Sequence, residues 1–487
     1  MKESAPASGP GPTERGDPSD LLRSTAELAV TFLRALPDRP VRVDHDVEGL
    51  RRSLLRPLPE DGEDPIRVIE DLARGADPGI VSMAGPRYFG FVIGGSLPAA
   101  VAADWLTSTW DQNAGLYAGG PAAAVVEEAV GAWLIDLFGL PPSSSYGLTT
   151  GCQMANFTCL AAARHAVLER AGWDVESKGL FDAPQVHVVV GAEMHSTVGA
   201  ALQYLGMGRD RVHSVPTDEQ GRMRLEPLET TLAEIPASVP LIVCLQAGNV
   251  NTGSFDPIDG AIRAIRRHAG AWVHVDGAFG IWAAVSPALR HLVAGIGGAD
   301  SWATDAHKWL NVPYDSGLAF VAHPTAHDAA LSPPHGAYLE YSPTQERDEV
   351  HWVPEFSRRA RGFAVYAALR SLGRSGVQAM VERCCEIATV MAGRLAADPR
   401  VEILNEVVLN QVLVRFIPAA GANGQDADQL TRAVIRRVQE DGVLWLSGTT
   451  WHGMAAMRIS VSNWSTTMTD AERSAEAILS ARDAVTA

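Results

Sequence analysis

Lys308 and Asp276 are the two residues of this sequence whose surroundings most favour chemistry. Lys308 lies between His307 and Trp309 in the motif ATDAHKWLN. An ammonium group is costly to bury, and a partly buried lysine with a lowered pKa can form a Schiff base. Asp276 ends the apolar run AWVHV and is followed by small residues. A carboxylate there could hold a flat heterocyclic cation, although an N-cap or an ion pair is the commoner role of such an aspartate.

Two further motifs supply an anion site and an imidazole. The small-residue loop TTGCQMAN (149–156) precedes a helical pattern, and free backbone N–H groups at a helix start attract phosphate. Most such loops are only turns. His195 follows the apolar run VHVVV in AEMHSTV, where a lone histidine is more often structural. Together the four motifs offer a phosphate seat, a ring partner, a Schiff-base lysine and a stacking imidazole, the set that pyridoxal phosphate needs.

The elements that position these residues are predicted by short, continuously apolar runs. Runs of this kind are buried on both faces, as in a largely parallel sheet, and they alternate here with helical patterns, which predicts an α/β fold. In an open α/β sheet, ligands bind beyond the carboxyl ends of the strands, where the motifs above lie. The predicted strands are VHVVV (186–190), LIVCL (241–245), AWVHV (271–275) and GLAFV (317–321), and the clearest helix covers 122–138.

The same patterns divide the chain into four parts. Residues 1–20 are rich in Gly, Pro and Ser and are expected to form a disordered tail, and residues 21–90 a helical N-terminal arm. Residues 91–385 form the large domain and 386–487 a small C-terminal α/β domain. Within the large domain, 325–356 lacks a clear period and is expected to be a mobile functional loop.

Composition excludes several classes of protein. Of 487 residues, 46% are hydrophobic and 20% charged, which is typical of a globular chain, and the net charge of −17 without a basic run argues against nucleic acid as a partner. The five cysteines contain no CxxC pair, so we expect no metal site and a reducing, cytoplasmic location. We expect no membrane span, because no stretch of 18 apolar residues occurs.

These motifs resemble the pyridoxal-phosphate-dependent group II decarboxylases, which include aromatic-L-amino-acid, tyrosine, histidine and glutamate decarboxylases. The resemblance covers about residues 80–480, and its most specific part is HVDGAFG with the lysine of DAHKWLN 32 residues after Asp276. It implies an aspartate-aminotransferase-like (fold type I) structure with a large, mostly parallel seven-stranded sheet. It also implies a homodimer with active sites at the subunit interface.

The resemblance further assigns roles to single residues. GAYLEY resembles the flexible catalytic loop, which makes Tyr338 the proton donor, with Tyr341 as the alternative. SRRARGF resembles a motif near the cofactor phosphate, MRISVSN carries an arginine near a substrate carboxylate, and the strand-like GPRYFGFVIGG (85–95) resembles the lining of the substrate pocket. The expected catalytic residues are Lys308, Tyr338, His195 and Asp276; the cofactor residues are Lys308, Asp276, Ala278, His195, Gly151, Cys152, Gln153, Thr252, Asp305, His307 and Gly362; the substrate residues are Phe89, Phe91, Val92, Asn113 and Arg458.

The sequence departs from the family pattern at its phosphate contacts. Cys152 and Gln153 stand where many members have Ser or Thr, Gly362 stands in place of a serine, and Asp305 replaces Asn or Ser. An extra carboxylate beside a phosphate is unfavourable, so His307 or backbone groups are expected to carry more of that contact.

The predicted activity is decarboxylation of an L-amino acid, aromatic or otherwise bulky, to the amine and CO2 through a Schiff base on Lys308 and a quinonoid intermediate. Alternatives on the same scaffold are oxidative decarboxylation-deamination to an aldehyde, transamination and retro-aldol cleavage. A non-catalytic dimeric binding protein is the alternative outside enzymology. A nucleotide-binding dehydrogenase is disfavoured, because no GxGxxG follows a strand.

Overall fold

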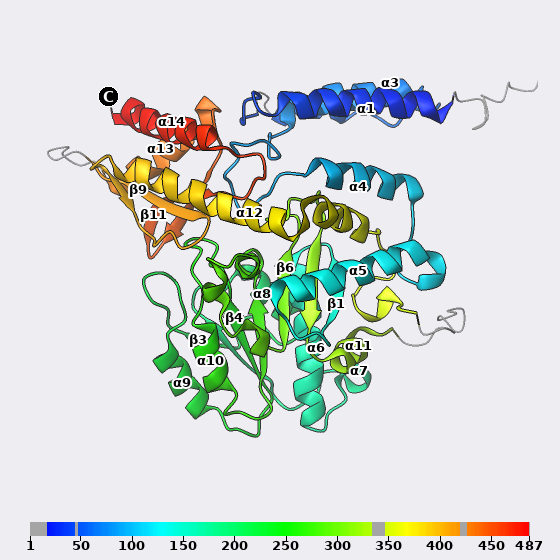
Figure 1. The fold of residues 1–487 in the computed structure, drawn as a ribbon, viewed down its shortest axis with the longest axis vertical. Coiled ribbons are helices and arrows are strands. Elements are labelled where there is room, and N and C mark those ends of the chain that lie inside the picture. Colours follow the sequence, from blue (N-terminus) through cyan, green and yellow to red (C-terminus); the bar gives the residue numbers. More distant parts are fainter. Residues whose placement is uncertain (1–16, 44–46, 334–345, 419–425, 487) are drawn as a thin grey trace, which may run out of the picture.

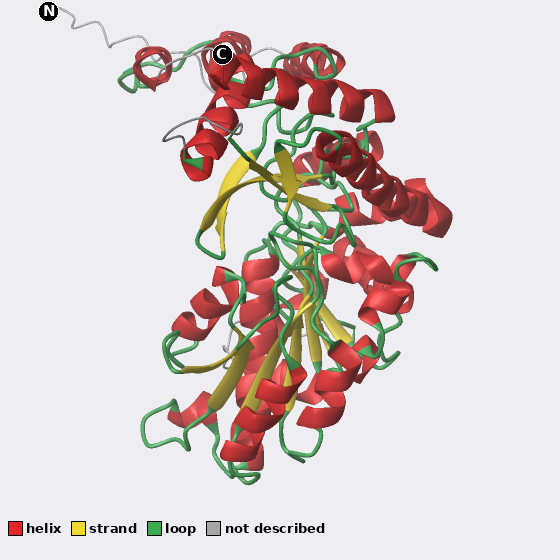
Figure 2. Cartoon of the chain, turned by 90° about the vertical axis from the view of Figure 1, so that its left-hand side faces the viewer, coloured by secondary structure: helices red, strands yellow, loops and turns green. Residues whose placement is uncertain are grey.

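The chain folds around two β-sheets that lie one above the other (Figures 1 and 2). The computed structural model describes residues 17–43, 47–333, 346–418 and 426–486. In this part of the chain no helix is both long enough and apolar enough to cross a membrane. Tyr338 and Tyr341 lie outside the described residues.

The large sheet has seven strands in the order β1-β7-β6-β5-β4-β2-β3. The pairs β6–β5, β5–β4, β4–β2 and β2–β3 are parallel, whereas β7 is antiparallel to both β6 and β1. The predicted α/β class is therefore confirmed. The strands are β1 Ser145–Thr149, β2 His187–Gly191, β3 Val212–Val215, β4 Leu241–Gln246, β5 Trp272–Asp276, β6 Ser301–Asp305 and β7 Gly317–Val321.

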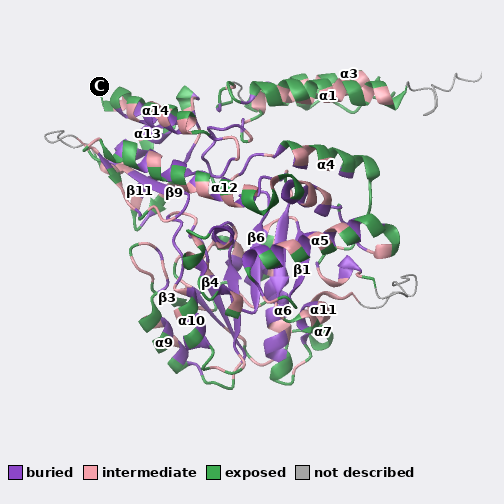
Figure 3. Ribbon diagram, in the orientation of Figure 1, coloured by how far each residue is buried: buried purple, intermediate pink, exposed green. Residues whose placement is uncertain are grey.

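Helices cover both faces of this sheet, and its strands are almost entirely buried (Figure 3). The alanine-rich helix α6 buries one whole side against the sheet, because its small side chains allow close packing. The helices are α1 Pro18–Ala35, α2 Val47–Leu54, α3 Pro65–Ala76, α4 Pro98–Trp110, α5 Pro121–Phe138, α6 Cys152–Arg170, α7 Val175–Lys178, α8 Ser196–Tyr204, α9 Leu225–Glu234, α10 Ile258–Ile265, α11 Pro324–Leu331, α12 Gly362–Ala396, α13 Ala427–Asp441 and α14 Met468–Thr486.

The C-terminal part builds the second sheet, which is antiparallel with the order β10-β11-β9-β8. Its strands are β8 Val401–Ile403, β9 Gln411–Phe416, β10 Ser447–Trp451 and β11 Met454–Ser460. The expected boundary after residue 385 falls inside α12, whose only non-helical residue is Gly373 (φ 62°). Beyond the kink at Gly373 the buried face continues from Val377 to Leu395, so the helix spans residue 385 and joins the two parts rather than ending between them.

Two other expected boundaries also differ from the structure. Helix α1 begins at Pro18, since the Asp17 side chain caps it by accepting the Ser19 N–H at 2.9 Å, so the tail ends before residue 20. The segment expected to be a loop over 325–356 begins inside α11. Beyond the undescribed residues, Glu349, Val350 and Val353 are buried. The charged residues and prolines of this segment favoured a loop in the sequence analysis, although these three residues pack in the interior.

Candidate active site

The carboxyl ends of β5 and β6 meet the start of α6 at one edge of the large sheet. Asp276 is the last residue of β5 and Asp305 the last of β6, and the two strands are parallel neighbours. Both carboxylates are buried, at 5% and 2% exposure. The cost of burying two carboxylates requires donors around each of them.

Lys308 is held by Asp305, with 2.9 Å between Lys308 Nζ and Asp305 Oδ2. Burial disfavours the ammonium charge, but the carboxylate of Asp305 outweighs it, with smaller contributions from Cys152 and Asp276, and raises the pKa of Lys308. The other oxygen of Asp305 accepts the backbone N–H of Cys152 at 2.6 Å and lies 3.3 Å from His307 Nε2. Asp305 thus links the lysine to the first residue of α6.

Asp276 receives three donors, two from α6 and one from the loop that follows β5. The Asn156 amide nitrogen lies 3.4 Å from Oδ2, the Ala278 N–H donates to Oδ1 at 3.2 Å, and the Cys152 thiol lies 3.6 Å from Oδ1. Burial, followed by the charges of Asp276 and Asp305, raises the pKa of Cys152 well above its ordinary value. The thiol therefore stays neutral, and Cys152 is a hydrogen-bonding residue rather than a nucleophile.

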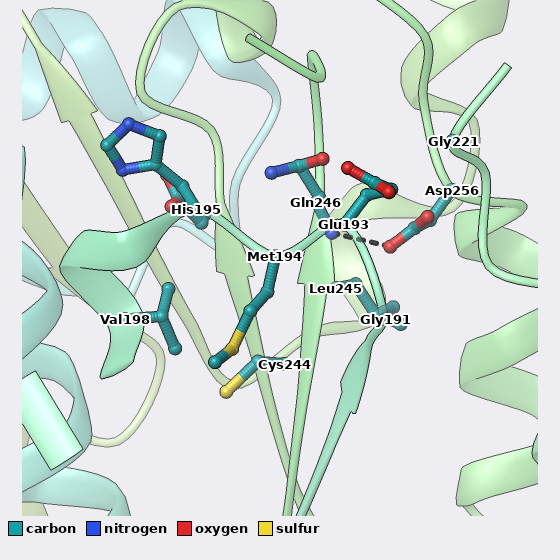
Figure 4. A pocket seen from close by; sticks show the side chains of 11 residues that line it. Gly191, Glu193, Met194, His195, Val198, Gly221, Cys244, Leu245, Gln246 and Asp256 are labelled. Atoms are coloured by element: carbon teal, nitrogen blue, oxygen red, sulfur yellow. Dashed lines mark hydrogen bonds between the residues drawn. The ribbon is translucent and has the colours of Figure 1, made fainter. Parts of the chain in front are cut away.

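His195 stands beside this cluster as the N-cap of α8. Its Nδ1 accepts the Thr197 N–H at 3.3 Å and lies 2.8 Å from the Thr197 hydroxyl. Figure 4 shows the ring at one side of a small cavity that Met194, Cys244 and Gln246 also line. Burial lowers the pKa of His195, so the imidazole is neutral at pH 7.

The residues present fit pyridoxal phosphate. The first amides of α6 have no intrahelical acceptor, the first helical bond being from Ala155 N to the Gly151 carbonyl. A Cβ at Gly151 would lie 3.3 Å from His307 Cε1, so glycine leaves the approach to the helix start more open than a larger residue would. The site thus offers the three groups that this cofactor needs: an anion-binding helix start at α6, the amine of Lys308 and the buried carboxylate of Asp276. Among the described residues, no three His, Cys, Asp or Glu side chains form a metal-binding group.

Three expected cofactor or substrate residues, Thr252, Gly362 and Asn113, have hydrogen-bond or packing partners within the chain. The Thr252 hydroxyl donates to the Gln220 carbonyl at 2.7 Å and bonds Ser254. Gly362 starts α12 where a Cβ would lie 2.8 Å from Glu127 Cγ, so it allows close helix packing. The Asn113 side-chain oxygen accepts the Gly115 and Arg358 N–H groups.

The expected substrate segment 85–95 is not a strand, since only Tyr88 forms an isolated bridge, to Trp445. Phe89 and Val92 are buried at 1% and 4% exposure and belong to the main core. Phe91 alone of the three is exposed, at 53%, and stacks on Trp445 with 5.6 Å between ring centroids. The aromatic residues of this segment therefore divide between core and surface.

Arg458 lies buried on β11 near the same edge of the large sheet. Its Nη1 is 3.4 Å from Asn251 Oδ1, and among the described residues its buried Nε has no hydrogen-bond partner. Burial lowers the pKa of Arg458 to about 10, and its charge contributes to the lowered pKa of His195. A cation with an unsatisfied donor is suited to bind an anionic group.

Asn156, His274 and Tyr314 contact these residues, although none was singled out from the sequence. Tyr314 stacks on His307 at 4.1 Å between centroids, and Asn156 joins His274 to Asp276. An asparagine inside an alanine-rich helix was the available signal for Asn156, because asparagine is unfavourable in helix interiors.

The buried imidazole of His274 predicts a loss of stability in acid. Burial lowers its pKa from 6.5 to about 4. Between these pH values the unfolded chain binds a proton that the folded chain does not, so the free energy of unfolding falls by about 3 kcal/mol as pH falls from 6.5 to 4. Thermal midpoints across this range should fall less steeply in His274→Gln than in wild type. The exposed His291→Gln variant should keep the wild-type slope, and equal slopes in all three proteins would contradict the prediction.

Comparisons with known proteins agree with this geometry. The model of the family described as "Pyridoxal-dependent decarboxylase conserved domain" matches residues 48–417. The aromatic-L-amino-acid decarboxylase of Bacillus atrophaeus is 26% identical over 91% of this chain and 90% of its own length. Tryptophan decarboxylase 1 of Oryza sativa subsp. japonica is 27% identical over 94% and 93%. The phenylacetaldehyde synthase of a Rosa hybrid cultivar is 26% identical over 86% and 84%.

Solved structures show the same fold. The crystal structure of Oryza sativa TDC with PLP and tryptamine superposes with a TM-score of 0.90 at 23% identity, covering 98% of this chain and 100% of that one. Mouse CSAD superposes with a TM-score of 0.87 at 24% identity, covering 96% and 99%. Both likenesses confirm the predicted fold type. With a family match over most of the chain and the cofactor's donor set at one sheet edge, this protein belongs to the pyridoxal-dependent decarboxylases and is a PLP-dependent amino acid decarboxylase.

Proposed function

We propose that this enzyme removes the carboxyl group of an L-amino acid with an aromatic side chain, giving the amine and CO2, with pyridoxal phosphate carried on Lys308. The observation that carries the proposal is the placement of Lys308, Asp276 and the start of α6 at one edge of the large sheet, where Asp305 contacts Lys308 and Cys152, and Cys152 contacts Asp276. The names of the curated relatives, which act on aromatic amino acids, support the side-chain class.

Bound pyridoxal phosphate accepts the electron pair left behind when CO2 departs. In the proposed arrangement the Lys308 amine would hold the cofactor. Asp276 is buried with three donors, and its carboxylate would keep a proton on the ring nitrogen. His195 would lie against the ring as a neutral imidazole, and Ala278 would contact the ring beside Asp276.

The anion seat at the start of α6 would hold the phosphate. Gly151, Cys152 and Gln153 would contribute backbone N–H groups, and His307 would add its imidazole. Asp305 lies in this seat and keeps Lys308 charged until the cofactor binds. Arg458, with its free Nε, would bind a substrate carboxylate, and Tyr338 would return a proton to the substrate carbon. Phe91 with Trp445 would offer an aromatic surface to the substrate.

A panel of L-amino acids tests the proposal. Purified enzyme loaded with pyridoxal phosphate is incubated with tryptophan, tyrosine and phenylalanine, and with glutamate and cysteine sulfinate as acidic competitors. CO2 and amine are measured together. The proposal predicts equal amounts of both products from an aromatic substrate and kcat/KM at least about 100-fold lower for the acidic ones, because an apolar site leaves a second carboxylate unpaired. Preference for an acidic substrate, or no CO2 from any aromatic one, would overturn it.

Aldehyde formation is the second candidate, because a relative with 26% identity is a phenylacetaldehyde synthase. That reaction consumes O2 and water and releases CO2, aldehyde, ammonia and hydrogen peroxide. Aldehyde and peroxide are therefore measured in the same assay. If they equal CO2 and the amine is absent, the oxidative reaction replaces simple decarboxylation.

Asp305→Asn should bind pyridoxal phosphate more tightly than wild type. The carboxylate lies 2.6 Å from Cys152 N, where it competes with and repels a phosphate at the same helix start. Removing one negative charge should lower the dissociation constant about tenfold, close to 1.4 kcal/mol. Quenching of tryptophan fluorescence in cofactor-free protein measures this directly. Asp315→Asn, which alters a carboxylate paired with Arg361, is the matched control and should leave the constant unchanged. Weaker binding by Asp305→Asn would show that Asp305 supports the phosphate.

We also propose a homodimer with active sites at the subunit interface and a cytoplasmic location. Helices α1 and α3 contain no buried residue in the single chain. Their apolar side chains are therefore uncovered, and Leu22, Leu33 and Leu72 are at least 41% exposed. An arm with an uncovered apolar face is stabilised by a second copy. All five cysteines are free, which favours a reducing compartment. Light scattering on the eluting peak of a gel-filtration column measures the mass of the assembly.

A further inference from the structure

A chain of buried hydrogen bonds leads from Trp272 to Asp276. Trp272 Nε1 donates to Ser301 Oγ at 2.9 Å, and Ser301 Oγ lies 2.9 Å from His274 Nδ1. His274 Nε2 lies 2.9 Å from Asn156 Oδ1, and Asn156 Nδ2 lies 3.4 Å from Asp276 Oδ2. All five side chains are buried. We call this set of residues the Trp272–Asp276 chain.

The donor and the acceptor of each hydrogen bond in the Trp272–Asp276 chain can be assigned one after the other, starting from Asp276. An ionised carboxylate only accepts, so the NH2 of Asn156 faces Asp276 and its oxygen faces His274. His274 must then carry a proton on Nε2. Burial lowers the pKa of His274 to about 4, so the ring is neutral and its Nδ1 accepts.

Ser301 completes the order. Its hydroxyl is the donor within reach of His274 Nδ1, at 2.9 Å. Its oxygen in turn accepts from Trp272, whose indole can only donate. Every proton in the Trp272–Asp276 chain therefore has one favoured position, and a network with all donors and acceptors matched is rigid.

Asn156 also connects to His195. Its amide nitrogen lies 3.4 Å from the Thr197 hydroxyl, which lies 2.8 Å from His195 Nδ1. The Thr197 N–H points at the same ring nitrogen, at 3.3 Å. Nδ1 therefore accepts, and the proton of the neutral imidazole lies on Nε2. The two N–H bonds of one amide serve Asp276 and Thr197 separately.

We propose that Asn156 is a positioning residue for the reaction: oriented by the Trp272–Asp276 chain, its amide donates to Asp276 and holds that carboxylate in place and, through Thr197, keeps the His195 proton on Nε2. This inference rests on the proposed function, because it assigns both partners of the cofactor ring to one buried amide. Without Asn156, Asp276 keeps only the Ala278 N–H and the Cys152 thiol.

Nitrogen NMR of cofactor-free protein labelled with 15N-histidine provides the first test, with the His274 signal identified by its loss in His274→Gln. The proposal predicts a neutral ring protonated on Nε2. A ring protonated on Nδ1 overturns the proposal. This measurement needs neither substrate nor cofactor, so it stands even if the enzyme fails to decarboxylate aromatic amino acids.

Ser301→Ala and Ser145→Ala form a matched pair for the second test. Ser145 Oγ lies 2.8 Å from Nδ1 of another buried histidine, His327, far from Asp276 in the sheet order. Each variant loses two hydrogen-bond contacts: Ser301 contacts His274 and Trp272, and Ser145 contacts His327 and the Val321 carbonyl. Their melting temperatures should therefore fall by a similar ~2 °C. Only Ser301→Ala should let the His274 proton redistribute, change the visible absorption of the bound cofactor and lower kcat several-fold at constant KM.

Asn156→Leu removes the hub itself and should lower kcat by about 10- to 100-fold with a changed cofactor spectrum. If that variant does not fold, the serine pair and the wild-type tautomer still decide the question. Equal kcat and equal cofactor spectra in Ser301→Ala and Ser145→Ala would show that the Trp272–Asp276 chain is only structural and would overturn the proposal.

Discussion

Replacing Lys308 with alanine is expected to lower kcat/KM by at least about 10³-fold, because the variant loses the one amine at the site. The sequence contains only three lysines, Lys2, Lys178 and Lys308, so no neighbouring lysine can take over. The variant should still bind pyridoxal phosphate without a covalent link, since the start of α6 and Asp276 remain. Turnover of the aromatic substrate and the visible absorption of the bound cofactor measure the two effects separately.

Lys178→Ala is the matched control for this prediction. Lys178 ends α7 and lies over the Trp173 ring, 5.1 Å from its centroid. Its replacement should leave turnover and spectrum unchanged. Retention of a tenth or more of the wild-type kcat/KM in Lys308→Ala would remove Lys308 from its proposed role.

Arg358→Met is expected to produce the largest loss of stability. Arg358 Nη1 lies 2.7 Å from Glu127 Oε1 and both side chains are completely buried. The same guanidinium donates to the carbonyls of Ala114 and Leu148 at 2.8 and 2.7 Å. Removing it leaves the Glu127 carboxyl buried without its cation, which costs about 3–5 kcal/mol. Denaturant unfolding followed by fluorescence measures the loss.

The surface pair of Arg374 with Asp136 supplies the control, since Arg374→Met should leave stability nearly unchanged. Glu127→Leu combined with Arg358→Met should recover much of the loss, because the double variant buries no lone charge. If Arg358→Met unfolds at the wild-type denaturant concentration, the pair does not anchor the segment that follows the undescribed residues 334–345.

The sequence predicted the strands that consist of continuous runs of apolar residues. VHVVV, LIVCL, AWVHV and GLAFV correspond to β2, β4, β5 and β7. The strand β6, SWATD, was missed because it buries polar residues, and β1 was missed because SYGLT contains serine, tyrosine and glycine. Both lie beside the site, where hydrogen bonding rather than hydrophobicity pays the cost of burial.

Site residues could be predicted where they end a strand, as Asp276 does, or lie in a specific motif, as Lys308 does. Contacts between residues far apart in the sequence could not be predicted. Arg358 meets Glu127 across 231 residues of sequence and Asn156 meets His274 across 118, so neither partner could be recognised from local pattern. SRRARGF resembles a motif near the cofactor phosphate, yet its Arg358 forms a buried ion pair with Glu127.

Borohydride reduction followed by peptide mapping tests the central claim most directly. Enzyme loaded with pyridoxal phosphate is reduced, digested and analysed by mass spectrometry, with each lysine peptide compared with an unloaded sample. The account predicts the pyridoxyl phosphate mass on the peptide that contains Lys308 and an unmodified Lys178 peptide. Cofactor mass on Lys178 or Lys2 with an unmodified Lys308, or no covalent cofactor on any peptide, would contradict it.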